Sequence, residues 1–249
     1  MPLRETEAIV LRTYRLGEAD KIVSLLTRSF GRLRAVAAGA QRPKSRYGGT
    51  LEPLSYLRLW LFERENRDLL RMNSAELLES FFDMQKDYRV QVAAQYIAEV
   101  TDRLLPEREV NERAFRLLLV TLRTWKHRAE ITRPLVYFNY WLLRLSGFLP
   151  DLEHCEACGS ALGDDPGYYG RGSEGLLCQG CRTAAATQAL PATLLALVRQ
   201  ARHATLDRWL ATEAPPSQGC LEARLFFEEL IESHIERKLV TRELLAMEA

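Results

Sequence analysis

Four cysteines are the residues of this chain whose types and spacing point most directly to a chemistry. They form two Cys-x-x-Cys pairs separated by residues 159–177, and the four are Cys155, Cys158, Cys178 and Cys181. This is the spacing of a four-thiolate zinc site, in which each pair lies on a tight turn and presents two sulfurs to one tetrahedral metal. Gly159 and Gly180 suit such turns, because glycine adopts left-handed backbone angles at no steric cost.

Disulfide pairing and an iron–sulfur cluster are the alternatives for the same four residues. The paired symmetry of a zinc ribbon favours zinc, and four thiolates leave no open coordination position at which a bound water could attack a substrate. We therefore expect one structural zinc that supplies the folding energy of a small module at residues 151–183. His154 could replace a thiolate ligand, although four cysteines already fill the tetrahedron. The fifth cysteine, Cys220, is expected to be a small buried hydrophobic residue.

The charge of the chain is distributed unevenly along its 249 residues. The net charge of +1 divides into +5 for residues 1–78 and −4 for the remainder. Seven basic residues and no acidic residue occur from Lys21 through Leu51. Most charge runs are solvated surface, but an acid-free run of this length favours contact with the phosphates of a nucleic acid.

A flexible basic segment at residues 39–49 adds the other features of a strand-binding site. Its three cations alternate with glycines, small residues and Tyr47, so its backbone can approach a phosphate chain while the tyrosine ring offers a stacking face. Such contacts bind without reading the base sequence. Trp60 and Phe62 could also stack on bases, although packing against a neighbouring domain is the favoured interpretation. The candidate DNA contacts are Arg12, Arg15, Lys21, Arg32, Arg34, Arg42, Lys44, Arg46 and Tyr47.

Short strands are predicted in the N-terminal part of the chain. We expect them at residues 6–14, 21–27, 31–38, 55–63 and 68–72, with a longer connection between the third and the fourth. Alternation is clearest where Leu57, Leu59 and Leu61 share one face of a strand. Five such strands suit an oligonucleotide/oligosaccharide-binding (OB) barrel, with an SH3-like barrel or a small open sheet as alternatives.

Helical periodicity is predicted from Ser74 to Leu149 and again after the cysteine module. Asn111 is a credible N-cap, and an aromatic-rich helix from Leu135 to Leu145 is expected to be buried. Further helices are expected at residues 191–210 and, after a loop at 215–216, along one long stripe from 221 to 239. The predicted organisation is α+β and multidomain: an OB domain at 1–78, a helical domain at 79–150 and 184–249, and the four-cysteine zinc-ribbon-like module at 151–183.

Catalytic signatures are missing from the sequence. It contains no phosphate-binding Gly-x-x-x-x-Gly-Lys-[Ser/Thr] loop, no Gly-x-Ser-x-Gly elbow and no His-Glu-x-x-His pair, and its four histidines are scattered. The composition is typical of a soluble protein, with no apolar run long enough for a membrane span. We therefore expect a non-enzymatic binding protein of a reducing cytoplasm.

The order and spacing of several segments resemble the RecO family of bacterial recombination mediators. They are TEAIVLRTYRLGEADKIV from residue 6, LLTR from 25, GRL from 31, AGAQRPKSRYGG from 38 and LEP from 51, with the helical body and the cysteine module following in the family's order. The resemblance covers the whole chain. It implies DNA repair and recombination: binding of single- and double-stranded DNA, annealing of complementary strands, and loading of RecA, with RecR, on DNA coated by single-stranded-DNA-binding protein (SSB).

The resemblance also implies that the acidic, hydrophobic C-terminal tail of SSB docks on the helical body, but no short motif marks that pocket. The alternative is a protein-interaction scaffold with a structural zinc ribbon and no affinity for nucleic acid. A nuclease is a more distant alternative.

Overall fold

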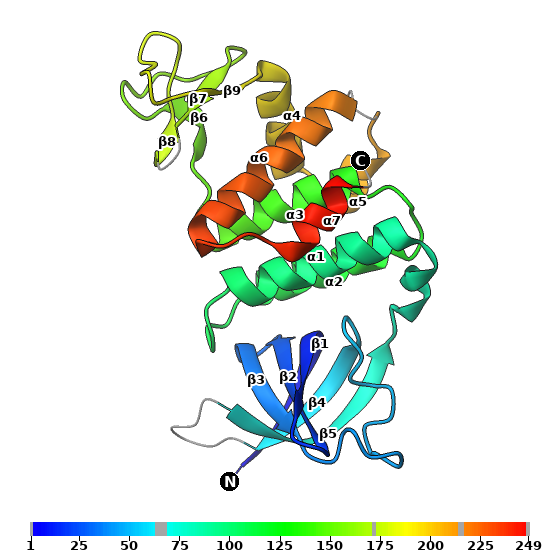
Figure 1. Cartoon of the computed structure of the whole chain (residues 1–249). Coiled ribbons are helices and arrows are strands. Elements are labelled where there is room, and N and C mark those ends of the chain that lie inside the picture. Colours follow the sequence, from blue (N-terminus) through cyan, green and yellow to red (C-terminus); the bar gives the residue numbers. More distant parts are fainter. Residues whose placement is uncertain (1, 63–68, 171–172, 214–216, 248–249) are drawn as a thin grey trace. The chain divides into compact units, whose positions relative to one another are not determined.

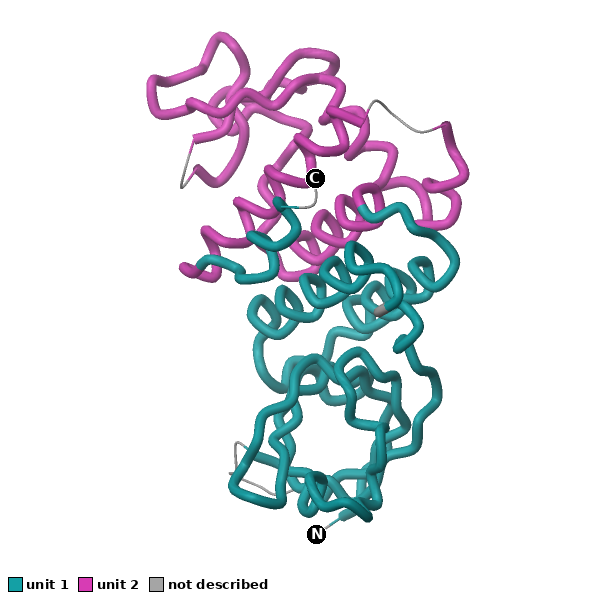
Figure 2. Tube along the Cα trace, turned by 45° about the vertical axis from the view of Figure 1, so that its right-hand side comes forward, with its two compact units in different colours: residues 1–131, 238–249 teal, residues 132–237 magenta. Residues whose placement is uncertain are grey.

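The computed structural model describes residues 2–62, 69–170, 173–213 and 217–247. The chain divides into two compact units, shown in separate colours in Figure 2. Unit 1 comprises residues 1–131 and 238–249, and unit 2 comprises residues 132–237.

Unit 1 begins with a closed barrel of five strands (Figure 1). The strands are β1 (Leu3–Leu16), β2 (Asp20–Thr27), β3 (Gly31–Ala37), β4 (Tyr56–Phe62) and β5 (Leu69–Glu79), in the closed order β1-β2-β3-β5-β4. All neighbours are antiparallel except β3 and β5. This topology and its match to the predicted strands confirm the OB-type barrel.

The leucines predicted to share one face of the fourth strand fill the interior of the barrel. Leu57, Leu59 and Leu61 are at most 2 % exposed and belong to the barrel core. The fifth strand is longer than expected, because residues 73–79 continue it where helical periodicity was predicted from Ser74. Their pairing with β4, through two register shifts, overrides the local pattern. The first helical turn, η1 (Phe82–Lys86), begins only after this strand has ended.

A segment from outside the barrel completes one of its seams. β3 and β5 pair over only a short stretch, from Arg34 to Val36 in β3. Next to this short pairing, the backbone N–H of Arg108 donates to the carbonyl of Arg32 at 2.7 Å. Gly31 makes the approach possible, since a Cβ at that position would lie 2.0 Å from the carbonyl oxygen of Glu109. Its φ of +67° also favours glycine.

Three helices complete unit 1: α1 (Tyr88–Leu104), α2 (Glu112–Trp125) and α7 (Val240–Ala246). The predicted N-cap of α2 is confirmed, because the Asn111 side chain accepts a hydrogen bond from Ala114 N at 3.0 Å. α1 packs against β1, β2 and α7. The long C-terminal helix that the sequence predicted is interrupted: it ends at Ile235, Glu236 has a φ of 51°, and α7 begins after Leu239.

Unit 2 contains α3 (Thr132–Leu145), α4 (Ala192–His203), α5 (Leu206–Ala211) and α6 (Ser217–Ile235). The aromatic-rich α3 is buried, as predicted, and packs on α6. The helix expected at 191–210 is broken at residues 204–205 into α4 and α5. The loop expected at 215–216 lies outside the described residues. Throughout the described part of the chain, no helix has the length and apolarity that crossing a membrane requires.

The cysteine module lies between α3 and α4 and is built from four short strands. They are β6 (Asp151–Cys155), β7 (Gly167–Tyr169), β8 (Gly175–Leu176) and β9 (Gln188–Leu190). β6 pairs with β8 and β7 with β9, so the module consists of two small sheets. The division into three domains at the predicted boundaries stays a prediction.

Candidate metal centre and candidate nucleic-acid surface

The four cysteines of the module converge on one point. Their sulfur atoms all lie within 4.8 Å of one another, and the sulfurs of Cys158 and Cys178 are 3.9 Å apart. Zinc–sulfur bonds of about 2.3 Å place the sulfurs of a tetrahedral site about 3.8 Å apart. The group therefore needs to contract only slightly to hold a metal ion, and all four donors are of the type that zinc prefers.

Tight turns place the sulfurs, as the spacing predicted. In the first turn, Gly159 donates from its backbone N–H to the carbonyl of Cys155 at 2.8 Å and has a φ of +71°. In the second, Cys181 N donates to the carbonyl of Cys178 at 3.1 Å. Gly180 does not adopt a left-handed angle, so the reason given for that glycine is wrong.

The electrostatics of the quartet suit a cation. Backbone N–H groups of Cys178 and Cys158 lower the pKa of Cys155 to about 6, whereas the hydrogen bonds and charge of the neighbouring sulfurs raise the pKa of Cys181 to about 12. A positive ion would stabilise all four thiolates together. His154 is exposed and its Nδ1 lies 3.1 Å from Asp151 Oδ2, so it is not one of the clustered ligands.

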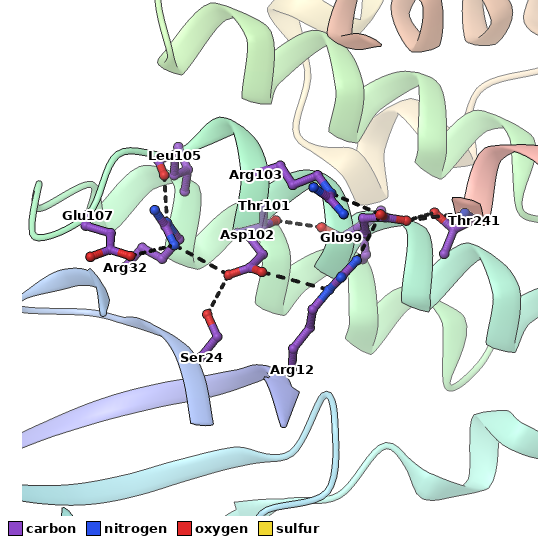
Figure 3. A network of polar contacts seen from close by, with 11 residues as sticks. Arg12, Ser24, Arg32, Glu99, Thr101, Asp102, Arg103, Leu105, Glu107 and Thr241 are labelled. Carbon is purple, nitrogen blue, oxygen red and sulfur yellow. Dashed lines mark hydrogen bonds and ion pairs between the residues drawn. The ribbon is translucent and has the colours of Figure 1, made fainter. Parts of the chain in front are cut away.

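Three of the predicted DNA contacts on the barrel strands, Arg12, Arg32 and Arg34, are held in ion pairs, and Figure 3 shows the first two. Arg12, on β1, lies 2.9 Å from Glu99 Oε1 and 3.8 Å from Asp102 Oδ2, both on α1. Arg32, on β3, donates from Nε to the carbonyl of Leu105 at 2.7 Å and also pairs with Asp102 at 3.6 Å. These two arginines therefore fasten the barrel to α1.

Glu99 is the buried centre of this network, with 1 % of its surface exposed. It also accepts hydrogen bonds from Thr241 N at 3.2 Å, from Thr241 Oγ1 at 2.7 Å and from Arg103 Nε at 3.0 Å. Burial by itself would raise the pKa of Glu99, but these hydrogen bonds and the charge of Arg12 outweigh burial and lower it. Burial likewise disfavours the charged form of Arg12, and hydrogen bonding to Tyr14 and the charge of Glu99 raise its pKa.

The acid-free run in the sequence is thus partly neutralised in three dimensions. Arg34 pairs with Glu107 at 3.0 Å, and Arg28 pairs with Glu7 at 2.8 Å. The acids that pair with Arg32 and Arg34 come from α1 and from the segment that follows it, far from β3 in the sequence. A count of charges along the sequence cannot show this pairing.

The remaining predicted cations lie on the β1–β2 hairpin and on the connection from β3 to β4. None of the five forms an ion pair with any residue that the structure describes; they are Arg15, Lys21, Arg42, Lys44 and Arg46. Two hydrogen bonds join the hairpin to the connection, from Gln41 N to Ala19 O at 2.9 Å and from Gly39 N to Asp20 Oδ1 at 2.7 Å. These two segments lie side by side and carry the five cations together with Glu18 and Asp20 of the hairpin; we call them the basic loop surface.

Tyr47 does not provide the stacking face that the sequence suggested. It is 1 % exposed, belongs to the barrel core, and donates from its hydroxyl to the carbonyl of Met72 at 3.2 Å. Arg46 covers it, with its guanidinium carbon 5.1 Å from the ring centroid. The ring closes the barrel beneath the basic loop surface, so any aromatic contact with a base must come from another residue.

Comparison with known proteins agrees with this architecture over the whole chain. The family models described as "Recombination protein O N terminal" and "Recombination protein O C terminal" match residues 1–81 and 85–243. A DNA repair protein RecO from Koribacter versatilis (strain Ellin345) is 40 % identical over 240 residues, which are 96 % of each chain. The chain belongs to the RecO family. Its role is accordingly in DNA repair and recombination.

More distant RecO proteins cover the same length. The DNA repair protein RecO of Nocardioides sp. (strain ATCC BAA-499 / JS614) is 35 % identical over 95 % of this chain and 96 % of its own. That of Anaeromyxobacter sp. (strain K) is 32 % identical over 95 % of this chain and 93 % of its own. The RecO resemblance inferred from the motifs is therefore confirmed.

Unit 2 contains a groove that no sequence motif marked. It has a volume of about 480 Å³ and lies between α3, α4 and the start of β6. Leucine, valine and proline side chains line it, together with Tyr140, three arginines and two acids; the charged residues are Arg144, Arg199, Arg202, Asp151 and Glu153. Arg202 pairs with Glu153 at 2.6 Å, whereas Arg144 makes no ion pair with the described residues and extends over the Trp141 ring at 5.7 Å. These residues come from three separate elements, so their proximity exists only in the fold.

Proposed function

We propose that this RecO-family chain binds single- and double-stranded DNA without strong sequence preference, anneals complementary strands and, with RecR, helps to load RecA on SSB-coated DNA. Such a protein works in the cytoplasm at the nucleoid. It binds and positions strands and catalyses no reaction. The observation that carries the proposal is the division of the cations of unit 1 into two groups. One group is fastened to acids, and the other forms the basic loop surface.

The basic loop surface supports phosphate contact better than the strands do. Arg42, Lys44 and Arg46 are exposed on a connection that contains Gly39, Gly48 and Gly49, so little side-chain bulk keeps a phosphate chain from the backbone. Lys21 and Arg15 lie opposite each other in the β1–β2 pairing. We therefore assign the main phosphate contacts to these five cations, and to Arg12, Arg32 and Arg34 the role of holding the barrel against its neighbouring segments.

Electrostatic capture also accounts for annealing. Two strands that approach each other carry like charges, and neutralisation of phosphates on both lowers their repulsion. Contacts to phosphates do not depend on the base sequence, so any complementary pair can be brought together.

The salt dependence of binding tests the proposal. The affinity for a labelled single strand should fall with a log–log slope of about −0.7 per contacted phosphate. Replacing Arg42, Lys44 and Arg46 with alanine together should weaken binding to single strands and duplexes and reduce that slope by about 2. The matched control replaces Lys86, Arg89 and Arg113, which are exposed basic residues on the helical elements of unit 1. A salt-insensitive affinity, or equal losses in both triple variants, would remove the basis of the proposal.

We propose zinc as the metal of the cysteine quartet, in a structural role. The four thiol donors and their near-tetrahedral separations support this assignment. Metal analysis of protein purified without added metal should find one zinc per chain. Iron with a visible absorption band would indicate a cluster in its place.

We further propose that the groove of unit 2 receives the acidic, hydrophobic C-terminal tail of SSB. Its leucine, valine and proline side chains suit hydrophobic side chains, and Arg144 suits a carboxylate. The test is a titration of a labelled peptide of that tail against the wild type and Arg144→Glu, with Arg208→Glu as the control because Arg208 is exposed on α5. We expect the Arg144 variant, but not the Arg208 variant, to lose affinity for the peptide. Equal binding by all three proteins would place the tail elsewhere.

The alternative is a protein-interaction scaffold without nucleic-acid affinity. It shares the groove and the zinc module, so only DNA binding separates the two. A fluorescence titration with a labelled oligonucleotide at low salt decides between them, and incubation of DNA with magnesium tests the nuclease alternative.

A further inference from the structure

Cross-strand pairing arranges the outer face of the barrel in parallel rows of side chains. One row consists of Arg12, Ser24 and Arg34, which are direct partners across β1, β2 and β3. The next row consists of Tyr14, Ile22, Val36 and Arg71, across β1, β2, β3 and β5. We call this second set the Tyr14 row.

The outward direction of the Tyr14 row follows from its neighbours in each strand. Val23, Ala35, Ala37 and Met72, which alternate with its members, belong to the barrel core. Side chains alternate between the two faces of a strand, so the members of the Tyr14 row point away from the core.

α1 covers the rows on one side of the Tyr14 row but not the row itself. The row that contains Arg12 is held to α1 through Asp102, which accepts a hydrogen bond from the Ser24 hydroxyl and forms an ion pair with Arg12. One row further, Leu26 and Ile9 are at most 1 % exposed. In contrast, Tyr14 is 46 % exposed, and Leu16 beyond it is 39 % exposed. An aromatic ring with apolar neighbours therefore emerges where the helix cover ends.

The Tyr14 row ends in a cation and lies next to the basic loop surface. Arg71 ends the row and pairs with no acid among the described residues. Arg15 and Lys21 alternate with Tyr14 and Ile22, so they belong to the other face of the same strands, at the rim of the barrel. The basic loop surface continues from here through the hydrogen bonds of Gln41 to Ala19 and to Asp20. An exposed ring beside Arg71 and the basic loop surface complements a chain with a phosphate backbone and flat apolar bases.

We propose that the Tyr14 row is the base-stacking platform of this protein and that Tyr14 is the residue on which an unpaired base stacks. The inference deepens the proposed DNA binding and rests on it. Bases of a duplex are already stacked on each other, so the platform serves single strands only. Arg12, in the neighbouring row, is fixed to α1 by its ion pair with Glu99, so the side chain beside the ring is ordered before a strand arrives.

The test compares a single-stranded oligonucleotide, the matching duplex and an abasic single strand of equal length at one salt concentration. Tyr14→Ala should weaken binding to the normal single strand by roughly 5- to 140-fold, the measured range for loss of one stacked base. Binding to the duplex and to the abasic strand should stay within about twofold of the wild type, because phosphate contacts are unchanged. Tyr14→Phe should keep most of the affinity, and Tyr88→Ala is the control, since Tyr88 is 53 % exposed at the start of α1.

Three results would overturn the inference. One is an unchanged single-strand affinity in Tyr14→Ala, another is an equal loss for single strands and duplexes, and the third is an equal loss in Tyr88→Ala. The alanine variant of Arg42, Lys44 and Arg46 separates this failure from a failure of the proposed function. If that variant loses affinity for DNA while Tyr14→Ala keeps it, the proposed DNA binding is supported and the stacking platform is refuted. A wild type that binds no DNA refutes both.

A photo-cross-link provides a second, independent readout. A strand that carries 5-iododeoxyuridine should cross-link to Tyr14 in the wild type, and mass spectrometry identifies the modified residue. Cross-links that map only outside residues 12–22, 34–36 and 71 would place the bases on another surface and contradict the platform.

Discussion

Removal of the Glu99 carboxylate should destabilise unit 1 more than any other single change in its polar network. The carboxylate joins three segments that are distant in the sequence: β1 through Arg12, α1 through Arg103, and α7 through Thr241. Its position at 1 % exposure means that water cannot replace these hydrogen bonds without opening the structure.

The expected magnitude follows from the partners that Glu99→Ala leaves behind. The backbone N–H of Thr241 would be a buried donor without an acceptor, which costs about 1–3 kcal/mol. The side chains of Arg12 and Arg103 are 30 % and 23 % exposed, so water can partly solvate them, and their lost pairing adds about 1 kcal/mol. We therefore expect a loss of about 2–4 kcal/mol in the free energy of unfolding. Glu99→Gln, which keeps an acceptor for Thr241, should cost about half of that.

Urea unfolding followed by circular dichroism measures the free energy, and hydrogen–deuterium exchange locates the change. Faster exchange is expected in residues 240–246 and along α1, with little change in unit 2. Thr241→Val should share part of the effect, so a double-mutant cycle with Glu99→Gln should show coupling of about 0.5 kcal/mol or more. A loss below about 0.5 kcal/mol in Glu99→Ala, the level of an ordinary surface substitution, would refute the reasoning.

The lowered pKa of Glu99 also implies that the stability of the fold depends on pH in a definite direction. The folded-state pKa of Glu99 lies below its unfolded value, so its charge stabilises the fold fully above the unfolded pKa of about 4.3. That contribution is lost as the pH falls through the lower folded-state pKa. The difference in stability between the wild type and Glu99→Gln should therefore shrink between pH 7 and acid. A difference that grows on acidification would contradict the direction of the shift.

Three further changes have definite expectations. Cys155→Ser should lower the zinc content and the melting temperature, with DNA binding affected only indirectly; a stable, zinc-loaded variant that has lost DNA affinity would instead make the module a DNA contact. Gly31→Ala should destabilise unit 1 by more than about 2 kcal/mol in urea unfolding, because its Cβ would clash with the backbone of Glu109; a cost typical of a solvent-exposed glycine would contradict this. Asn111→Ala should cost about 1 kcal/mol in the same assay through the lost cap of α2, and Asn111→Asp, which keeps an acceptor, should restore most of it.

The sequence predicted the features that depend on local pattern. Period-two alternation located the barrel strands, because Leu57 and its partners must face one core. The spacing of the cysteines predicted their convergence, since a metal site imposes its geometry on a short segment. Asn111 was visible as an N-cap because its role is settled within one turn of the chain.

Features that depend on distant segments were not predictable in this way. Arg32 looked like a phosphate contact because its partner Asp102 lies on α1, far from β3 in the sequence. Tyr47 looked exposed among glycines and cations, yet the closing barrel takes in its ring. Tyr14 carried no distinguishing signal, since its exposure depends on where the cover of α1 ends. The sequence therefore predicted the family and the barrel better than the surroundings of individual side chains.

The short seam between β3 and β5 bears on how this protein can be divided for experiments. A fragment of residues 1–81, which the family boundary suggests as a self-contained piece, lacks both the 107–109 segment that bonds to Arg32 and the α1 acids. It would leave the carbonyl of Arg32 unpaired next to the short β3–β5 seam, beside unneutralised arginines and the buried apolar side chains of Leu26 and Ile9. The exposed backbone and apolar side chains would promote aggregation. The unpaired arginines would attract nucleic acid through its phosphates, whatever its sequence. DNA affinity measured on that fragment would therefore overstate the affinity of the intact barrel, and a faithful truncation must retain residues 82–131 and the C-terminal helix.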